Sequence, residues 1–490
     1  MTTSLDTRPA PVRPDSPGAV ARAGGLHPVG VLVLLAGAFL PIADFFIVNV
    51  ALPTIDASLH ASAAALELVV AVYGVAYAAV LVLGGRLGDR FGRHNLFQVG
   101  LVGFILASLA CGLAPSIGIL IAARLVQGAA AAMLVPQVLA TCHATLEGER
   151  KTRALALYGA TSGIAAVVGQ VASGLLISAD IAGTSWRPIF LINVPLGIAV
   201  FVSSRIVVPA NRSPHPASID VPGTVLFAAT LTALLVPLTE GHTLGWPAWT
   251  WVLLAVAVAL AAVTVVVERR AETRGEVPLL PPSLLKLPSM SRGLAMIAAF
   301  SLGFGSFMFV FALTVQGGLH ASPLKAGLAI LPMAVLFLLG SIVSPKLINR
   351  FGRGVLAVGG LVQGTGLALL IVILATGWPH VSLAELGGPL LLVGAGQSML
   401  FAGLFRAVLS DVPAHLAGVG GGVLITLQQS GLALGVATLG TLYLALEPHS
   451  IPEAFGSAVG VQLGIVVLLV VGSRFLPRFT AHAADIPVEQ

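Results

Sequence analysis

Long apolar runs separated by short polar segments are the dominant pattern of this 490-residue chain. Fourteen such runs follow one another, and most are close to the ~20 residues that an α-helix needs to cross a bilayer. The pattern predicts an all-α membrane protein with fourteen transmembrane helices. We place these helices near residues 29–53, 66–85, 94–114, 117–141, 154–179, 188–208, 221–239, 249–267, 292–315, 325–344, 354–377, 386–409, 418–446 and 455–473.

One charged segment occurs twice in the chain. Residues 84–93 hold three arginines, one aspartate and four glycines, and we expect a tight turn at the membrane surface there. The residues Arg-Phe-Gly-Arg at 90–93 recur at 350–353. Each copy follows the second helix of a group of six, so helices one to six match helices nine to fourteen. The remaining two helices are then an insert between two six-helix bundles.

The repeat also predicts the domain boundaries. The first residues are polar and proline-rich and lack the apolar core of a signal peptide. We expect a disordered cytoplasmic tail (1–28), an N-terminal six-helix bundle (29–210), a two-helix insert with a cytoplasmic linker (211–291), a C-terminal six-helix bundle (292–476) and a cytoplasmic tail (477–490).

The placement of charges predicts the orientation. With both termini in the cytoplasm, all but three of the 25 lysines and arginines fall in inner loops or tails, the exceptions being Arg124, Arg187 and Lys325. This distribution satisfies the positive-inside rule. All five tryptophans fall near outer loops, where an interfacial aromatic belt is expected. We therefore predict a multi-pass protein of the cell membrane, plasma or inner.

Composition excludes several other classes of protein. Hydrophobic residues make up 57% of the chain, above the roughly 45–50% usual in soluble proteins. The net charge of +5 is spread over small groups, which argues against a nucleic-acid partner. The two cysteines suggest neither a disulfide framework nor redox chemistry. The sequence lacks a phosphate-binding loop, a zinc motif and a nucleophile elbow, so we expect no enzyme activity and no metal site.

Four segments resemble signatures of the major facilitator superfamily, specifically its fourteen-helix drug:proton antiporter branch. They are residues 84–93 between helices two and three, 44–53 in helix one, 124–128 in helix four and 186–195 at the start of helix six. The resemblance covers about residues 29–475. It implies the major facilitator fold, with two bundles rocking about a midplane site. It also implies proton-coupled export of small amphipathic compounds such as drugs or antibiotics, by a monomer that uses the proton gradient and no cofactor.

One position departs from that branch. Its helix-five signature has a Gly-Pro pair, and Gln170 stands at the proline position, although Gly163, Gly169 and Gly174 keep a line of small residues. A facilitator or importer of a small metabolite on the same fold is therefore the alternative. A membrane receptor or scaffold is a further alternative, but the chain offers no soluble signalling domain to support it.

Asp44 and Arg124 are the predicted proton-coupling residues. Asp44 lies in the middle of the first run, where an ionised carboxylate costs about 2.5–3.5 kcal/mol on insertion scales, and intramembrane acids mark functional sites. Arg124 is the only basic residue well inside a helix, and a cation near Asp44 would set the point of proton release. The alternatives are a fixed packing contact for Asp44 and a snorkelling side chain for Arg124.

Intramembrane amides and aromatic residues are the candidates for the substrate cavity. Gln127 lies three residues after Arg124, near the same helical face, and Tyr73 and Tyr77 share a face at i, i+4 spacing. For each of them, packing against a neighbouring helix is the alternative. The full set is Asn49, Tyr73, Tyr77, Gln127, Gln170, Gln363, Gln397, Gln428 and Gln429.

The segment 84–93 is predicted to act as a gate. We expect Gly88 and Gly92 to allow close approach between the bundles, and Asp89 to bond a helix start or a neighbouring arginine only while the inner side is shut. Asn349 stands in place of Asp89 in the second copy. The predicted gating residues are Gly88, Asp89, Arg90, Gly92 and Arg93.

The other acidic residues are expected at helix ends or in loops. Glu67, at the outer start of helix two, is interpreted as a solvated carboxylate, with a proton-entry role as the alternative. In the second half no predicted helix interior carries a charge. Proton coupling is therefore expected in the N-terminal bundle alone. A nearly neutral cavity favours neutral or singly charged cargo.

Overall fold

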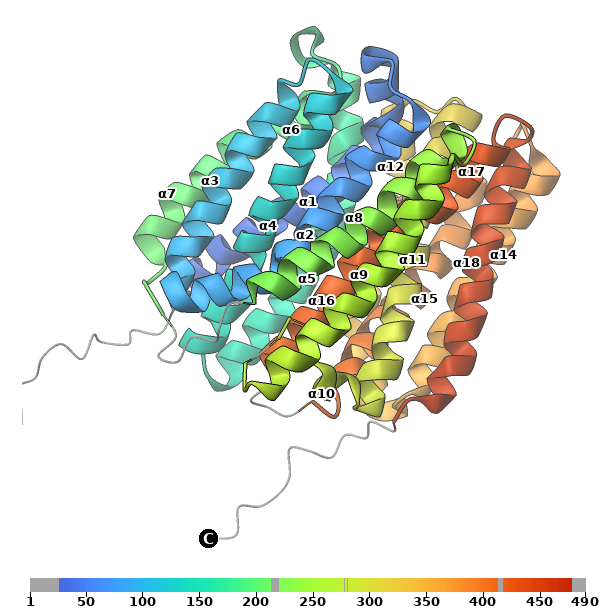
Figure 1. Cartoon of the computed structure of the whole chain (residues 1–490). Coiled ribbons are helices and arrows are strands. Elements are labelled where there is room, and N and C mark those ends of the chain that lie inside the picture. Colours follow the sequence, from blue (N-terminus) through green and yellow to red (C-terminus); the bar gives the residue numbers. More distant parts are fainter. Residues whose placement is uncertain (1–25, 213–219, 277, 280, 413–416, 478–490) are drawn as a thin grey trace, which may run out of the picture.

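The computed structural model describes residues 26–212, 220–276, 278–279, 281–412 and 417–477 (Figure 1). These residues form helices and helical turns, with no strand among them. Thirteen helical segments of the described chain are long and apolar enough to cross a membrane. α5 (Gly148–Ala179) adds a crossing that is apolar over residues 164–179, so the structure agrees with fourteen transmembrane helices. The predicted tails lie almost entirely outside the described residues.

The first six crossings form the N-terminal bundle. Local sequence explains where the helices begin: the Ser62 hydroxyl accepts from the Ala65 amide at 3.2 Å, and Pro188 occupies the first position of its helix. The helices are α1 (Pro28–Leu59), α2 (Ala63–Phe91), α3 (Arg93–Gly112), α4 (Ile117–Thr145), α5, and the consecutive pair α6 (Pro188–Leu191) and α7 (Asn193–Val207).

The last six crossings form the C-terminal bundle, and two helices lie between the bundles in sequence. The insert consists of α8 (Val221–Thr243) and α9 (Ala248–Thr273), followed by the short α10 (Pro282–Leu285). The C-terminal bundle contains α11 (Pro288–Leu313) with the π turn Thr314–Gly318, α12 (Pro323–Ala329) with α13 (Leu331–Phe351), α14 (Gly354–Gly377), α15 (Leu383–Leu409), α16 (Ala417–Gly435) with the π turn Val436–Gly440 and α17 (Thr441–Leu446), and α18 (Ile451–Gly472).

Close glycine contacts show that the two bundles are packed in the same way. Gly128 of α4 lies directly against the backbone of Tyr73 in α2, and Gly394 of α15 lies against the backbone of Met333 in α13. A Cβ atom at either glycine would collide with that backbone. A second matched pair follows the same rule, because Gly169 of α5 meets the Ala43 carbonyl in α1 as Gly435 of α16 meets the Leu302 carbonyl in α11. The repeat predicted from sequence is therefore a repeat of helix packing.

The repeated Arg-Phe-Gly-Arg has a backbone explanation. Gly92 ends α2 with a φ of 100°, and Gly352 ends α13 with a φ of 56°, so both lie in the region that favours glycine. The expected surface turn over residues 84–93 is wrong for most of its length, because α2 remains helical to Phe91. α2 is 29 residues long, more than a bilayer requires, so its charged end projects as helix.

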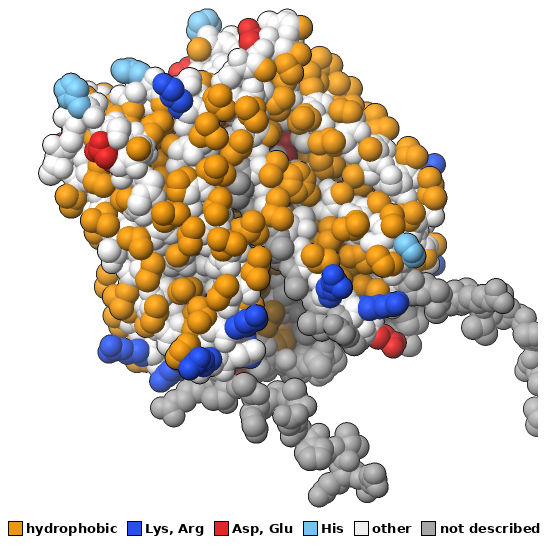
Figure 2. All heavy atoms as spheres, turned by 180° about the vertical axis from the view of Figure 1, so that it is seen from behind, with side chains coloured by type: hydrophobic (Ala, Val, Ile, Leu, Met, Phe, Trp, Pro, Cys, Tyr) orange, Lys and Arg blue, Asp and Glu red, His pale blue; other side chains and the backbone are white. Residues whose placement is uncertain are grey.

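The insert packs on the N-terminal bundle at its junction with the C-terminal bundle. Phe227, Leu231 and Leu235 of α8 share a buried cluster with residues of α2 and with Ala433 and Ala437. α9 packs against α8 and leaves most of its apolar surface exposed, as expected of a helix that faces lipid. Figure 2 shows the broad apolar band on the back face of the molecule. At the end of α2, the Arg86 guanidinium donates to the Pro278 carbonyl at 2.7 Å and fixes the linker.

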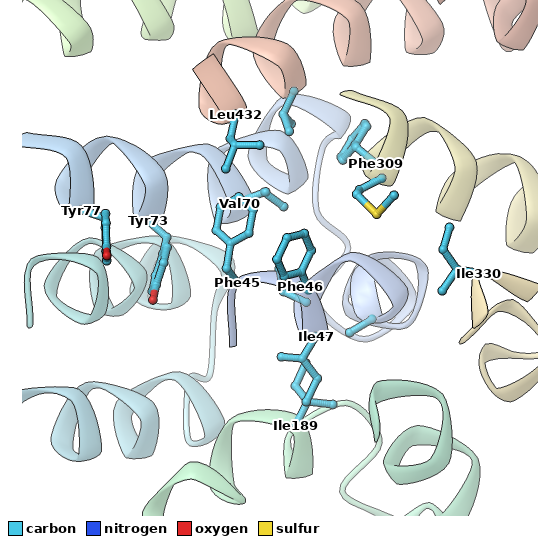
Figure 3. Packing of buried hydrophobic residues seen from close by; sticks show 14 of the residues in the cluster. Phe45, Phe46, Ile47, Val70, Tyr73, Tyr77, Ile189, Phe309, Ile330 and Leu432 are labelled. Carbon is cyan, nitrogen blue, oxygen red and sulfur yellow. The ribbon is translucent and has the colours of Figure 1, made fainter. Parts of the chain in front are cut away.

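The two bundles meet along α2 with α16 and along α5 with α12. A Cβ at Gly74 of α2 would lie 3.3 Å from Ala433 Cβ in α16, and Gly174 of α5 lies against the Pro323 carbonyl. Phe46 of α1 contacts Phe304 of α11 with ring centroids 5.8 Å apart. Figure 3 shows Phe46 among side chains from both bundles, including Phe309 and Leu432. We call the whole contact surface between the two bundles the seam.

Candidate functional site

Asp44 points into the N-terminal bundle, while its neighbour Phe46 packs against Phe304 of the C-terminal bundle. Figure 3 shows the next two residues in the chain, Phe45 and Phe46, with Phe45 near Tyr73. The Asp44 side chain is buried and accepts hydrogen bonds from three side chains on two helices, α4 and α7. The donors are the Arg124 guanidinium, Gln127 Nε2 at 3.0 Å and Asn193 Nδ2 at 2.6 Å. The buried carboxylate therefore has both a cation partner and two amide donors.

Arg124 is fully buried in α4. Besides its ion pair with Asp44, it donates through Nε to the Val69 carbonyl at 3.1 Å and through Nη1 to Gln127 Oε1 at 2.8 Å. Its guanidinium carbon lies 4.2 Å from the ring centroid of Tyr73, close enough for a cation–π interaction. The alternative of a snorkelling side chain is wrong, because no part of Arg124 reaches the surface.

α3 completes the cluster around Asp44. Gln127 Nε2 also donates to Ser108 Oγ at 2.8 Å, and the Cys111 thiol donates to Gln127 Oε1 at 3.6 Å. Ser108 and Asn193 were not among the predicted site residues. Asn193 could have been found, since it is the only amide in the sixth apolar run, whereas a serine in an apolar helix carries almost no signal. The predicted pair Asp44 and Arg124 is present; its part in coupling stays a prediction.

The charged cluster has no counterpart in the C-terminal bundle. The matched glycine contacts place Gly303 at the position of Asp44, Leu390 at that of Arg124 and Val393 at that of Gln127. Gln462 of α18 lies beside Gly303, much as Asn193 of α7 lies beside Asp44. The bundles therefore share their backbone packing and differ in their buried charge.

Four predicted cavity residues lie on or near the seam. Gln170 is buried, with its Nε2 3.7 Å from the Met308 sulfur across the seam. Asn49 is buried and donates to the Phe46 carbonyl at 3.3 Å. Gln428 and Gln429 are half-buried in α16, and the Gln429 carbonyl faces Gly74.

The other cavity candidates lie inside one bundle or the other. Tyr73 donates to the Pro41 carbonyl at 2.9 Å and stacks with Tyr77, with ring centroids 6.4 Å apart. Gln363 and Gln397 are buried within the C-terminal bundle, on α14 and α15. Both amide atoms of Gln397 are without a hydrogen-bond partner among the described residues. The structure therefore does not bring all nine candidates together.

The segment 84–93 contacts its own bundle and the linker. Gly88 lies against the Gln137 side chain of α4, so the expected approach between bundles does not occur at this glycine. Asp89 pairs with Arg93 at 2.8 Å on a partly exposed surface, and Arg90 is exposed. In the second copy, Asn349 accepts from Arg406 of α15. Gating by this segment stays a prediction.

Glu67 differs from its expected environment. Its side chain is buried rather than solvated, and the Thr441 hydroxyl of α17 lies 2.9 and 3.1 Å from its two carboxylate oxygens. The sequence could not show this, because the burial comes from a helix more than 370 positions away. No group of three or more potential metal ligands occurs within the described ranges.

The fold and the buried site define a polytopic transporter built from two matched six-helix bundles and a two-helix insert. Residues 34–436 match the family model of the Major Facilitator Superfamily. The chain therefore belongs to the Major Facilitator Superfamily.

Relatives along nearly the whole chain agree with this assignment. The chain is 35% identical to a probable actinorhodin transporter of Streptomyces coelicolor, over 88% of this chain and 76% of the relative. It is 34% identical to a puromycin resistance protein of Streptomyces alboniger, over 93% and 92%. It is 35% identical to a cephamycin export protein of Amycolatopsis lactamdurans, over 92% of each.

Solved structures support the fold. A POT family transporter in complex with 5-aminolevulinic acid superposes with a TM-score of 0.67 at 13% identity, over 91% of this chain and 96% of the other. An auto-inhibited POT family peptide transporter gives 0.66 at 16% identity, over 94% and 99%. At these identities the likeness is one of fold alone.

Proposed function

We propose that the chain is a proton-coupled exporter of small amphipathic compounds such as drugs or antibiotics, working by alternating access. The relatives named for actinorhodin transport, puromycin resistance and cephamycin export support antibiotic export. The observation that carries the proton coupling is the fully buried Asp44–Arg124 pair. This pair occurs in one bundle, while glycine and leucine stand at the matching positions of the other.

Protonation of Asp44 would change the balance of charge in the cluster. An ionised Asp44 compensates Arg124, which has no other acidic partner among the described residues. A proton on Asp44 leaves Arg124 as an uncompensated buried cation, and breaking a buried pair costs about 3–5 kcal/mol. The bundle relieves this cost by rearranging, and in our proposal that rearrangement accompanies the switch between states. Asp44 takes up a proton in the outward-open state and releases it in the inward-open state in exchange for cargo.

We also propose that the protein functions as a monomer in the cell membrane with both termini in the cytoplasm, and that residues 29–210 and 292–476 are the bundles that rock. The distribution of charge supports this orientation. In Figure 2 the lysines and arginines gather mainly along the lower rim of the molecule, below the apolar band. The positive-inside rule places such a rim in the cytoplasm.

Transport by purified protein in vesicles tests the coupling. An imposed pH gradient is expected to drive cargo movement by the natural protein, and Asp44→Asn is expected to abolish that dependence. Asp89→Asn is the matched control, since Asp89 belongs to the same bundle but is partly exposed and paired with Arg93. This control is expected to slow turnover and keep the proton dependence. Transport that ignores the gradient in both the natural protein and Asp44→Asn would refute the proposal.

A facilitator or importer of a small metabolite is the second candidate, and Gln170 is the observation that favours it. This buried amide stands at the seam, where the antiporter branch has proline. The direction of flux in vesicles separates the two functions. Growth inhibition by a diverse panel of toxic compounds, in cells with and without the protein, would identify the cargo.

A further inference from the structure

The environment of Glu67 combines three parts of the molecule. Glu67 lies in the first turns of α2 in the N-terminal bundle, and its hydroxyl partner Thr441 begins α17 in the C-terminal bundle. The same hydroxyl lies 3.3 Å from the Leu238 carbonyl of α8, which belongs to the insert. Glu67 is 1% exposed. A carboxyl group is therefore enclosed where both bundles and the insert meet.

The charges around Glu67 do not compensate an ionised carboxylate. Among the described residues, the charged side chain with an electrostatic effect on Glu67 is Glu240 of α8, whose carboxylate would repel an ionised Glu67. From the C-terminal bundle it meets Thr441 and Gly440, and the latter packs on Phe309. A buried carboxylate without a cation costs several kcal/mol. Asp44, by contrast, has Arg124 and two amide donors.

The hydrogen-bond inventory points the same way. Thr441 has one hydroxyl proton, yet its oxygen lies within bonding distance of Glu67, of the Leu238 carbonyl and of the Ala437 carbonyl at 2.9 Å. If Glu67 is ionised, that proton serves only one of the three acceptors. If Glu67 carries a proton, it donates to Thr441, and Thr441 donates to a carbonyl. Only with a protonated Glu67 can Thr441 accept from the carboxyl group and still donate its own proton to one of the two carbonyls.

We propose that Glu67 is a second proton-binding site and that it must be protonated for the seam to close at the start of α2. When α2 and α17 separate, water reaches Glu67 and the proton leaves; when they close, a proton is taken from the same side. Glu67 thus sets the pH dependence of closure and carries no net proton across the membrane. This inference builds on the proposed exporter function, in which Asp44 provides the coupling.

Infrared spectroscopy of the purified full-length protein tests the protonation directly. The carbonyl stretch of a neutral carboxylic acid is expected in the natural protein and is expected to be lost in Glu67→Gln. Glu240→Gln is the matched control and should retain the band. An unchanged spectrum in Glu67→Gln would overturn the proposal, and because no cargo is needed the result is independent of the exporter function.

Closure is measured with a cysteine pair. Gly74→Cys and Ala433→Cys bring two Cβ atoms near 3.3 Å across the seam, so their oxidative cross-linking reports contact between α2 and α16. The cysteine pair is compared in two backgrounds, one with Glu67 and one with Glu67→Gln, and the second corrects for the effect of pH on the thiols. With Glu67 present, cross-linking is expected to fall as the outer pH rises, relative to the Glu67→Gln background. The fall is at most about tenfold per pH unit, the limit for release of one proton. Identical pH profiles in both backgrounds would overturn the proposal.

Thr441 variants separate proton binding from simple packing. Thr441→Ser keeps the hydroxyl that accepts from Glu67 and is expected to preserve the pH profile of closure. Thr441→Val keeps the shape and removes the hydroxyl, and it is expected to shift closure to lower pH. Equal profiles for the two variants would show a role in packing only and would overturn the inference. If Glu67→Gln abolishes gradient-driven transport while Asp44→Asn keeps it, Glu67 is the coupling residue and both proposals fail.

Discussion

Arg124 dominates the electrostatics of the N-terminal bundle at the scale of single residues. It is fully buried, and its charge is balanced by Asp44 alone among the described residues. Its remaining contacts are neutral: the Val69 carbonyl, the Gln127 amide and the face of Tyr73. The opposite charges of Asp44 and Arg124 compensate each other among polar neighbours. Loss of either side chain leaves the other as an unpaired buried charge.

Removal of Arg124 is therefore expected to destabilise the protein more than removal of both charges. Arg124→Leu leaves Asp44 buried and unpaired, at a cost of about 3–5 kcal/mol. The double variant Arg124→Leu/Asp44→Asn is expected to recover part of this loss, because no charge remains buried. Thermal unfolding in detergent measures the three stabilities. The unfolding temperature of the double variant is expected to lie between those of the natural protein and Arg124→Leu.

The pair Arg93 and Asp89 supplies the matched control for this cycle. It is also an ion pair in the N-terminal bundle, but it is partly exposed, and such pairs contribute about 0–1 kcal/mol. Arg93→Leu is expected to change the unfolding temperature little. Strictly additive losses for Arg124→Leu and Asp44→Asn would contradict the picture of a coupled buried pair.

Residues at membrane depth could be predicted from sequence to different degrees. Asp44, Arg124 and Gln127 stand out because a charge or an amide in an apolar run is costly and therefore rare. Their mutual contact could not be derived, since 80 positions separate Asp44 from Arg124. Glu67 was misjudged for the same reason, because sequence shows that it begins a helix but not that Thr441 covers it.

At the scale of helices, the two glycines that end α2 and α13 are expected to matter for their conformation. Gly92→Ala puts a side chain at a φ of 100°, which costs about 1–3 kcal/mol, although no atom blocks the added methyl group. Gly460→Ala in α18 is the control, because it is helical and has open space around it, so a gain of up to about 1 kcal/mol is expected. Thermal unfolding of Gly92→Ala and Gly460→Ala measures the two changes in stability. Equal changes would contradict the explanation that Gly92 is needed for its positive φ.

Helix boundaries show where pattern reading reached its limit. The apolar runs located every crossing, because spanning a bilayer demands about 20 apolar residues. They ended helix two near residue 85, whereas α2 continues to Phe91. Hydropathy registers the part of a helix that touches lipid, and the polar turns of α2 beyond it form backbone hydrogen bonds without giving that signal. Arg86, which holds the linker at Pro278, lies in this extension.

At the scale of the whole molecule, equal packing and unequal charge have separate consequences. The matched glycines give both bundles the same internal packing, and in the proposed mechanism the two bundles rock against each other as similar bodies. Asp44 and Arg124 restrict the proposed coupling to one bundle, while Glu67 places a titratable group where the bundles touch. Coupling and closure can then be altered independently by mutation.

The seam itself depends on small residues that let α5 approach α12. A Cβ at Gly174 would lie 2.6 Å from the Pro323 carbonyl, and one at Gly327 would lie 2.7 Å from the Gln170 carbonyl, so neither helix can accommodate a side chain there.

Gly174→Val is expected to hold the bundles apart at this end and to lower transport by about tenfold or more, since even a ~1.4 kcal/mol penalty on the closed state shifts its population tenfold. Gly464→Val, in open space on α18, is expected to leave transport within about twofold, because a surface change away from contacts shifts stability by about 0.5 kcal/mol or less. Cross-linking between Gly74→Cys and Ala433→Cys should fall with transport in Gly174→Val; full cross-linking with lost transport would place the defect outside the seam.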